Sequence, residues 1–155
     1  MEKLLTIFTT AANNNFIKIV LIAIVCDTIF GVLRAIKEKK FNSNFGIDGA
    51  IRKSGMIVSI FFFVLVDAVI DINLIGFIPD TLLQYMKVDR IGLTEFFSSL
   101  YIVYEAVSIL KNMTLCGLPV RKVWEQLKKF LVKYTDELPD DDELVSDQEN
   151  GIRIK

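Results

Sequence analysis

The sequence predicts an all-α integral membrane protein, with three transmembrane helices followed by a C-terminal basic amphipathic helix. Three observations support this fold class. Hydrophobic residues make up 52% of the 155 residues and gather in long blocks, which is typical of membrane proteins. Polar segments rich in lysine and arginine separate these blocks. We therefore expect one three-span membrane domain, residues 16–117, with short segments on either side.

Residues 1–15 are expected to be an amphipathic N-terminal segment outside the membrane domain. Leu4, Leu5, Ile7 and Phe8 give it apolar side chains, and an asparagine run ends it. We expect a turn that lies on the membrane surface, with a disordered segment as the alternative.

The first span covers about residues 16–36. At about 1.5 Å per residue it is long enough for the hydrocarbon core of about 30 Å. Its thirteen Ile, Val, Leu and Phe residues each favour insertion by about 0.3–0.6 kcal/mol, against about 3 kcal/mol for the central Asp27. Ala23, Gly31 and Ala35 share a face with Asp27, so a neighbouring helix can pack closely there. We expect copies of the chain to meet through this face.

Asp27 is a carboxylate near the middle of an apolar helix, and two hypotheses for it stay open. In the first, Asp27 faces an aqueous path or becomes hydrated when helices assemble. In the second, it pairs inside a helix bundle, either with Arg34, which projects to nearly the same side, or with a base of a partner chain.

Residues 41–53 are expected to be a polar connection, because Asn, Ser and Gly are frequent in turns. Positive charges surround it, and short loops of this kind stay in the cytoplasm. The first span should therefore run from outside to inside. The bases that set this topology and contact lipid are Lys37, Lys39, Lys40, Arg52 and Lys53.

The second span is expected at about residues 55–78, and its C-terminal end is open. In a continuous helix Asp67 and Asp71 lie on one face. Alternatively, the helix ends near Asp71, which would place both carboxylates at the outer interface.

The third span, about residues 91–115, is marginal because Glu95 and Glu105 offset much of its apolar content. It should insert only with partners. Spacings of three and four give it one polar stripe, which we interpret as a face that meets water or polar neighbours. The stripe consists of Ser98, Tyr101, Glu105, Ser108 and Asn112.

Residues 118–135 follow a Gly-Leu-Pro break and predict an interfacial amphipathic helix with Trp124 on its apolar side. Its bases favour contact with anionic lipids and a cytoplasmic C-terminus. Asp136 to Glu149 contain eight acidic residues and no base, so residues 136–155 are expected to be a disordered acidic tail. The bases of the helix are Arg121, Lys122, Lys128, Lys129 and Lys133.

Several function classes are disfavoured by what the chain lacks. It has no histidine, no glycine-rich phosphate loop, no nucleophile motif and no cysteine cluster. We expect no enzymatic activity, no cofactor and no metal. Nucleic acid is not an expected partner, because the bases flank apolar spans and do not share one soluble face.

Two blocks of the sequence resemble the toxin-secretion/phage-lysis holin family, within a resemblance that covers residues 16–134. The first is DTIFGVLRAIKEKKFNSNFGIDGAIRKSG, residues 27–55, and the second is YIVYEAVSILKNMTLCGLPV, residues 101–120. Arg121 departs from the family pattern, which has a second proline there. The matching positions are Asp27, Gly31, Ala35, Ser43, Gly49, Lys53, Gly55, Glu105, Ser108, Asn112, Gly117 and Pro119.

The resemblance implies a small phage-type protein that forms homo-oligomers in the bacterial cytoplasmic membrane and opens lesions there. The family includes the holin that accompanies large clostridial toxins, so the released protein would be an endolysin or a toxin. The alternative is a membrane interaction protein that forms no pore, such as a holin inhibitor or an anchor. A small transporter subunit is a third class, and the absence of an internal repeat disfavours it.

Overall fold

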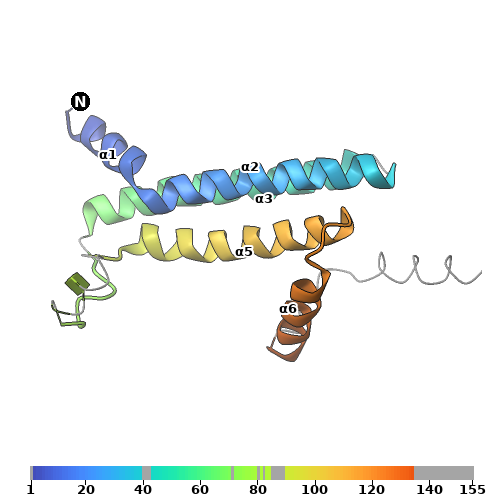
Figure 1. Cartoon of the computed structure of the whole chain (residues 1–155). Helices are drawn as coiled ribbons and strands as arrows, with labels where there is room; N and C mark the ends of the chain where they lie inside the picture. Colours follow the sequence, from blue (N-terminus) through green and yellow to red (C-terminus); the bar gives the residue numbers. More distant parts are fainter. Residues whose placement is uncertain are drawn as a thin grey trace, which may run out of the picture.

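A computed structural model describes residues 2–39, 43–70, 72–79, 81, 83–84 and 90–134. Helices α1 (Glu2–Asn13), α2 (Asn15–Glu38), α3 (Ser43–Val69), α5 (Leu93–Leu115) and α6 (Arg121–Tyr134) form this part of the chain, which contains no strand. Figure 1 shows three long helices side by side, α2, α3 and α5, with the shorter α1 and α6 at opposite ends of this bundle. The all-α prediction is confirmed.

The helices α2, α3 and α5 are each long and apolar enough to cross a membrane, in agreement with the predicted number of spans. The main helix pairing is between α2 and α5, and α3 packs less extensively on α5. Val20 and Ile24 of α2 meet Met56 and Ile60 of α3 in a small apolar core. Most other large apolar side chains point outward, as Val58 does. Such a surface suits lipid and not water.

Helix α2 begins and ends through local backbone chemistry. Asn14 is its N-cap, and the Asn14 side-chain oxygen accepts hydrogen bonds from the backbone N–H groups of Phe16 (2.9 Å) and Ile17 (3.3 Å). These bonds satisfy two N–H groups that have no partner within the helix. The helix ends at Glu38, and the φ of 53° at its C-cap, Lys39, lies in the left-handed region.

The N-terminus of α5 is capped by side chains from other positions in the bundle. Asp67 of α3 accepts hydrogen bonds from the backbone N–H groups of Leu93 (3.1 Å) and Thr94 (2.8 Å). Glu95 accepts one from the Gly92 N–H (2.8 Å) and one from the Asn14 side chain (2.6 Å). Carboxylates are favourable at a helix N-terminus because they complement its partial positive charge. These contacts tie α2, α3 and α5 together at one end.

Gly92 has no room for a larger side chain beside this cap. A Cβ atom there would lie 2.9 Å from an Asp67 carboxylate oxygen and 3.0 Å from a Glu95 oxygen. We expect Gly92→Ala to reduce the stability of the bundle in detergent by about 1–3 kcal/mol, measured by thermal unfolding. Gly46→Ala is the matched control, because open space surrounds that position, and it should be neutral or stabilising. Equal effects of the two substitutions would contradict this role for Gly92.

The C-terminus of α5 ends in a Schellman motif. The N–H of Leu118 donates to the Met113 carbonyl (3.1 Å), and the N–H of Gly117 donates to the Thr114 carbonyl (2.9 Å). Gly117 has a φ of 84°, which favours glycine. Lys37 of α2 donates to the Leu115 carbonyl (2.9 Å), so α2 and α5 are also joined at this end.

The structure corrects several predicted boundaries. Residues 2–13 form a twelve-residue helix, α1, and not only a turn. Most of the predicted polar connection 41–53 is helical, because α3 begins at Ser43. Helix α3 ends at Val69, so the expectation of a span reaching residue 78 is wrong and the alternative ending near Asp71 is closer. Asp71, Lys40 and the acidic tail lie outside the described residues.

Candidate functional site: a polar network between apolar helices

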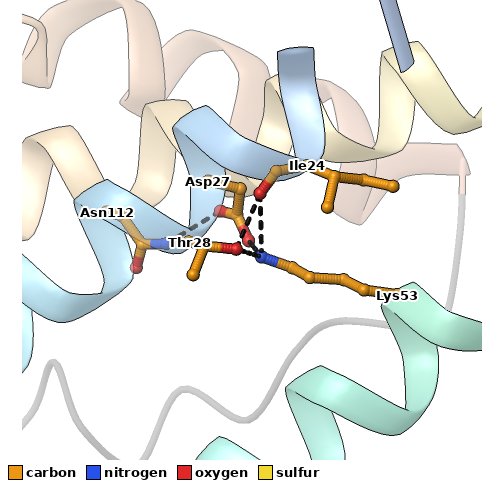
Figure 2. A network of polar contacts seen from close by, with 5 residues as sticks. All are labelled: Ile24, Asp27, Thr28, Lys53 and Asn112. Carbon is orange, nitrogen blue, oxygen red and sulfur yellow. Dashed lines mark hydrogen bonds and ion pairs between the residues drawn. The ribbon is translucent and has the colours of Figure 1, made fainter. Parts of the chain in front are cut away.

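Asp27, at the middle of α2, holds the centre of a polar network inside the bundle. Its side chain is buried, with the residue only 5% exposed. One carboxylate oxygen of Asp27 lies 2.9 Å from the Lys53 ammonium, and the other accepts a hydrogen bond of 3.0 Å from the Asn112 amide. Figure 2 shows Lys53 reaching from α3 to α2, where it also donates to the Thr28 hydroxyl (2.6 Å) and the Ile24 carbonyl (3.3 Å).

This arrangement corrects two interpretations of the bases. The intramolecular partner of Asp27 is Lys53 and not Arg34, which pairs with Glu38 at 3.1 Å. Lys53 therefore does more than set topology. The sequence carries a signal for this, because spacings of three and four residues put Lys53 on one helical face with the apolar Met56 and Ile60.

The face of α2 that carries small residues packs against α5 of the same chain. A Cβ atom on Gly31 would lie 3.9 Å from the Asn112 side-chain nitrogen. Asp27, on the same face, binds that same side chain. Ala23 and Ala35 of this face are half-buried. The neighbouring helix expected at this face is thus intramolecular, so a contact between copies would use another surface.

Glu105 of α5 is the least satisfied group of the network. It is fully buried, and neither carboxylate oxygen has a hydrogen-bond partner among the described residues. The hydroxyl groups of Ser98 and Thr94 are likewise buried and have no hydrogen-bond partner among the residues that the structure describes. Burial of an unpaired polar group is unfavourable, and most strongly so for a charge. The inner side of α5 therefore carries several buried polar atoms that make no hydrogen bond with the described residues.

The predicted stripe on α5 faces the other helices of the bundle. Asn112 and Ser98 are buried with Glu105, and Ser108 is half-buried. The Tyr101 hydroxyl lies 2.7 Å from the Ser59 hydroxyl of α3. In the single chain this stripe is therefore covered by protein.

Fewer contacts hold α3 on α5 than join α2 to α5, and they include the apolar core around Met56 and Ile60. Besides the Lys53 interactions and the Tyr101–Ser59 hydrogen bond, Phe63 of α3 stacks on Phe97 of α5 with 4.0 Å between ring centroids. The Asp67 cap adds a contact at one end. If α3 moved away from α5, the polar groups of α2 and α5 would lose their cover.

The remaining predicted bases lie in the half of the bundle where α2 ends, α3 begins and α6 follows α5. Arg52 lies 5.3 Å from the centre of the Tyr104 ring, a cation–π geometry. Arg121 pairs with Glu125 at 2.9 Å on exposed α6. Trp124 of α6 is buried. The other bases of α6 are the exposed Lys122, Lys129 and Lys133 and the half-buried Lys128.

The network can bind through charged groups and hydrogen bonds. It brings the carboxyl group of Asp27 to the ammonium of Lys53 and to the side-chain amide of Asn112. The described residues contain no group of three or more acidic, histidine or cysteine side chains placed to hold a metal ion. The surrounding apolar helices cover the polar side chains of Asp27, Ser98, Glu105 and Asn112.

Comparisons with known proteins agree with this architecture. The chain is 48% identical over 129 residues to the "Holin-like protein TcdE" of Clostridioides difficile, and the match covers 83% of this chain and 78% of that protein. No solved structure matches the chain significantly. A sequence model described as the bacteriophage holin family matches residues 5–136. The chain therefore belongs to the bacteriophage holin family.

Proposed function

We propose that this holin forms homo-oligomers in the bacterial cytoplasmic membrane and opens lesions that release an endolysin or a toxin. The observation that carries the proposal is the polar network at the centre of three apolar helices. Asp27, Lys53 and Asn112 satisfy one another, whereas the buried carboxyl group of Glu105 has no partner among the described residues. Such groups are costly in a membrane and usually serve a function there.

The proposed mechanism follows from what the bundle covers. In the closed chain, α3 and α2 hide the polar face of α5. When many copies are crowded together, separation of α3 lets the polar faces of neighbouring copies line water. Hydration of Asp27 and Glu105 then offsets the free energy needed to detach α3, and the membrane potential collapses.

The proposed orientation places the N-terminus outside and the C-terminus in the cytoplasm. Bases cluster at the end of the bundle where α2 ends and α6 begins, as they do in cytoplasmic segments. Helix α6 presents exposed Lys122, Lys129 and Lys133 beside exposed Val123 and Phe130. This combination favours contact with anionic lipid headgroups.

The test removes the charges of the network together. We expect the combined variant Asp27→Leu, Lys53→Met, Glu105→Leu to insert in the membrane but to depolarise it only after a several-fold longer delay, because an apolar lining excludes water. A potential-sensitive dye in induced bacteria measures the delay. Val25→Leu, on the exposed side of α2, is the control and should behave as the wild type. Unchanged insertion and unchanged timing in the combined variant would refute the hydrated-face mechanism.

A second candidate is a membrane interaction protein that forms no pore, such as a holin inhibitor or an anchor. The observation that favours it is that both carboxylate oxygens of Asp27 are satisfied within one chain. Such a bundle needs no second copy to shelter that charge. Expression of the wild type separates the two candidates, since the inhibitor or anchor should cause no sudden depolarisation when produced alone.

A further inference from the structure

The outward side of α3 carries two opposite charges on one helical face. Asp48, Arg52 and Gly55 follow spacings of four and three residues, so they lie in one row. All three are exposed. The row belongs to the segment Gly46–Val69, which is long and apolar enough to cross a membrane.

The charges of this row are poorly satisfied within the chain. The Asp48 carboxylate makes no hydrogen bond or ion pair with the described residues. The Arg52 guanidinium lies over the exposed Tyr104 ring at 5.3 Å but likewise forms no hydrogen bond or ion pair with them. Arg52 is next to Lys53, which pairs with Asp27 near the middle of α2, so the row lies at a depth where exposed charges are unfavourable against lipid tails. A partner with complementary charges would remove this cost.

The same row allows another helix to come close. Open space surrounds the position of a Cβ atom on Gly55, and also on Gly49 nearby. Small residues at such places let two helix backbones approach each other in a membrane. The other small-residue face, on α2, is already covered by α5 of the same chain. The row on α3 is therefore a free surface of suitable shape.

The geometry points to a second copy of this chain as the partner of the row, with α3 packed against α3 around a two-fold axis along the membrane normal. Copies inserted in the same orientation place these helices parallel. Side chains four or five residues apart then meet across the contact, as charged flanking residues do in parallel coiled coils. Asp48 of each copy pairs with Arg52 of the other, and the Gly55 positions of the two copies form the close contact.

A second copy fits this surface better than a lipid headgroup does. A phosphate group would be attracted to Arg52 but repelled by Asp48, one turn away. A surface with one charge of each sign is complementary to itself, which is what a two-fold contact requires. The inference rests on the proposed homo-oligomerisation and names the surface that starts it.

The first experiment maps the contact by disulfide cross-linking in membrane vesicles. In a background with Cys26→Ala and Cys116→Ala, we expect Gly55→Cys to form oxidised dimers at least about tenfold more than Val25→Cys, since a tenfold difference needs only about 1.4 kcal/mol of contact energy. Val25 is the matched control, because it is also exposed and lies at a similar depth in the bundle. It is two residues from Asp27, and Asp27 pairs with Lys53, which is two residues from Gly55. Equal cross-linking at the two positions would overturn the inference.

The second experiment exchanges the charges. Asp48→Lys alone and Arg52→Glu alone should each reduce the co-purification of differently tagged copies about tenfold or more, because like charges then face each other. The double exchange Asp48→Arg with Arg52→Asp should restore it. The two single variants, expressed together, should also associate with each other. Failure of both rescues would overturn the inference even if Gly55→Cys perturbs packing.

The outcomes separate this surface from the proposed function. If the wild type depolarises the membrane while cross-linking and charge exchange have no effect, the surface is wrong and the proposed function stands. If the wild type neither associates nor depolarises the membrane, the proposed function fails. If the effect of Arg52→Glu appears only in vesicles that contain anionic lipid, and Asp48→Lys has no effect, Arg52 contacts lipid headgroups. The assignment of a second copy as the partner is then refuted.

Discussion

Lys53→Met is expected to destabilise the helix bundle by about 3–5 kcal/mol, because it leaves the buried carboxylate of Asp27 without its cation. Lys53 bridges α3 to α2 through its contacts with Asp27, Thr28 and the Ile24 carbonyl. Methionine keeps most of the length of the side chain but provides neither charge nor hydrogen-bond donor. The free energy of unfolding in mixed detergent micelles measures the effect. Depolarisation should then begin earlier in induced cells, because α3 is held less firmly.

Two further variants show whether the effect of Lys53→Met comes from loss of the ion pair. Lys18→Met removes an exposed lysine that donates to the Asn13 carbonyl, and it should change stability by less than about 0.5 kcal/mol. Adding Asp27→Asn to Lys53→Met removes the uncompensated charge and should recover most of the stability. If the double variant is no more stable than Lys53→Met alone, the effect lies in packing of the lysine stem and not in the ion pair.

Glu105→Met is expected to act in the opposite direction and to stabilise the closed bundle by about 1–3 kcal/mol, the cost of burying a polar group without a hydrogen bond. Glu105 is fully buried, and its carboxyl oxygens find no hydrogen-bond partner among the described residues. An apolar side chain of similar volume removes that cost without opening a cavity. The same unfolding measurement in detergent gives the gain, and the onset of depolarisation in cells should be delayed.

Tyr101→Phe is the matched control for Glu105→Met, since it lies one turn away on the same side of α5. It removes a hydroxyl that is bonded to Ser59 at 2.7 Å, so it should weaken the bundle by about 0.5–1.5 kcal/mol. Reduced stability in Glu105→Met would contradict the prediction, because it would mean that the carboxyl group has a favourable partner in the closed state.

Much of the fold could be predicted from local sequence properties. Length and hydropathy locate three spans, and α5 begins and ends within two residues of its prediction. Asn14 and Gly117 give signals at the ends of α2 and α5 that can be recognised from residue type. The start of α3 could not be predicted in this way. Glycine and asparagine in residues 41–53 favour turns, but the helical state of Gly46 and Gly49 costs only about 1 kcal/mol each.

The site depended more on contacts between distant residues. That Asp27 is important followed from its place in an apolar helix, but its partner did not. Arg34 is close to Asp27 in sequence, whereas Lys53 lies on another helix and meets Asp27 only because α3 folds back on α2. The Asp67 cap of α5 is non-local in the same way. Periodicity shows which residues share a face, but it does not show which helix covers that face.

The caps at the two ends of α5 have a mechanical consequence. Asn14 binds Glu95 at one end and Lys37 binds the Leu115 carbonyl at the other, so α5 cannot slide lengthwise along α2 without breaking both. Helix α3 is joined to α5 at its C-terminal end by Asp67. Piston-like movement of α5 along α2 is therefore unfavourable, whereas the sideways separation of α3 that we propose leaves both of these contacts intact and requires the release of Lys53.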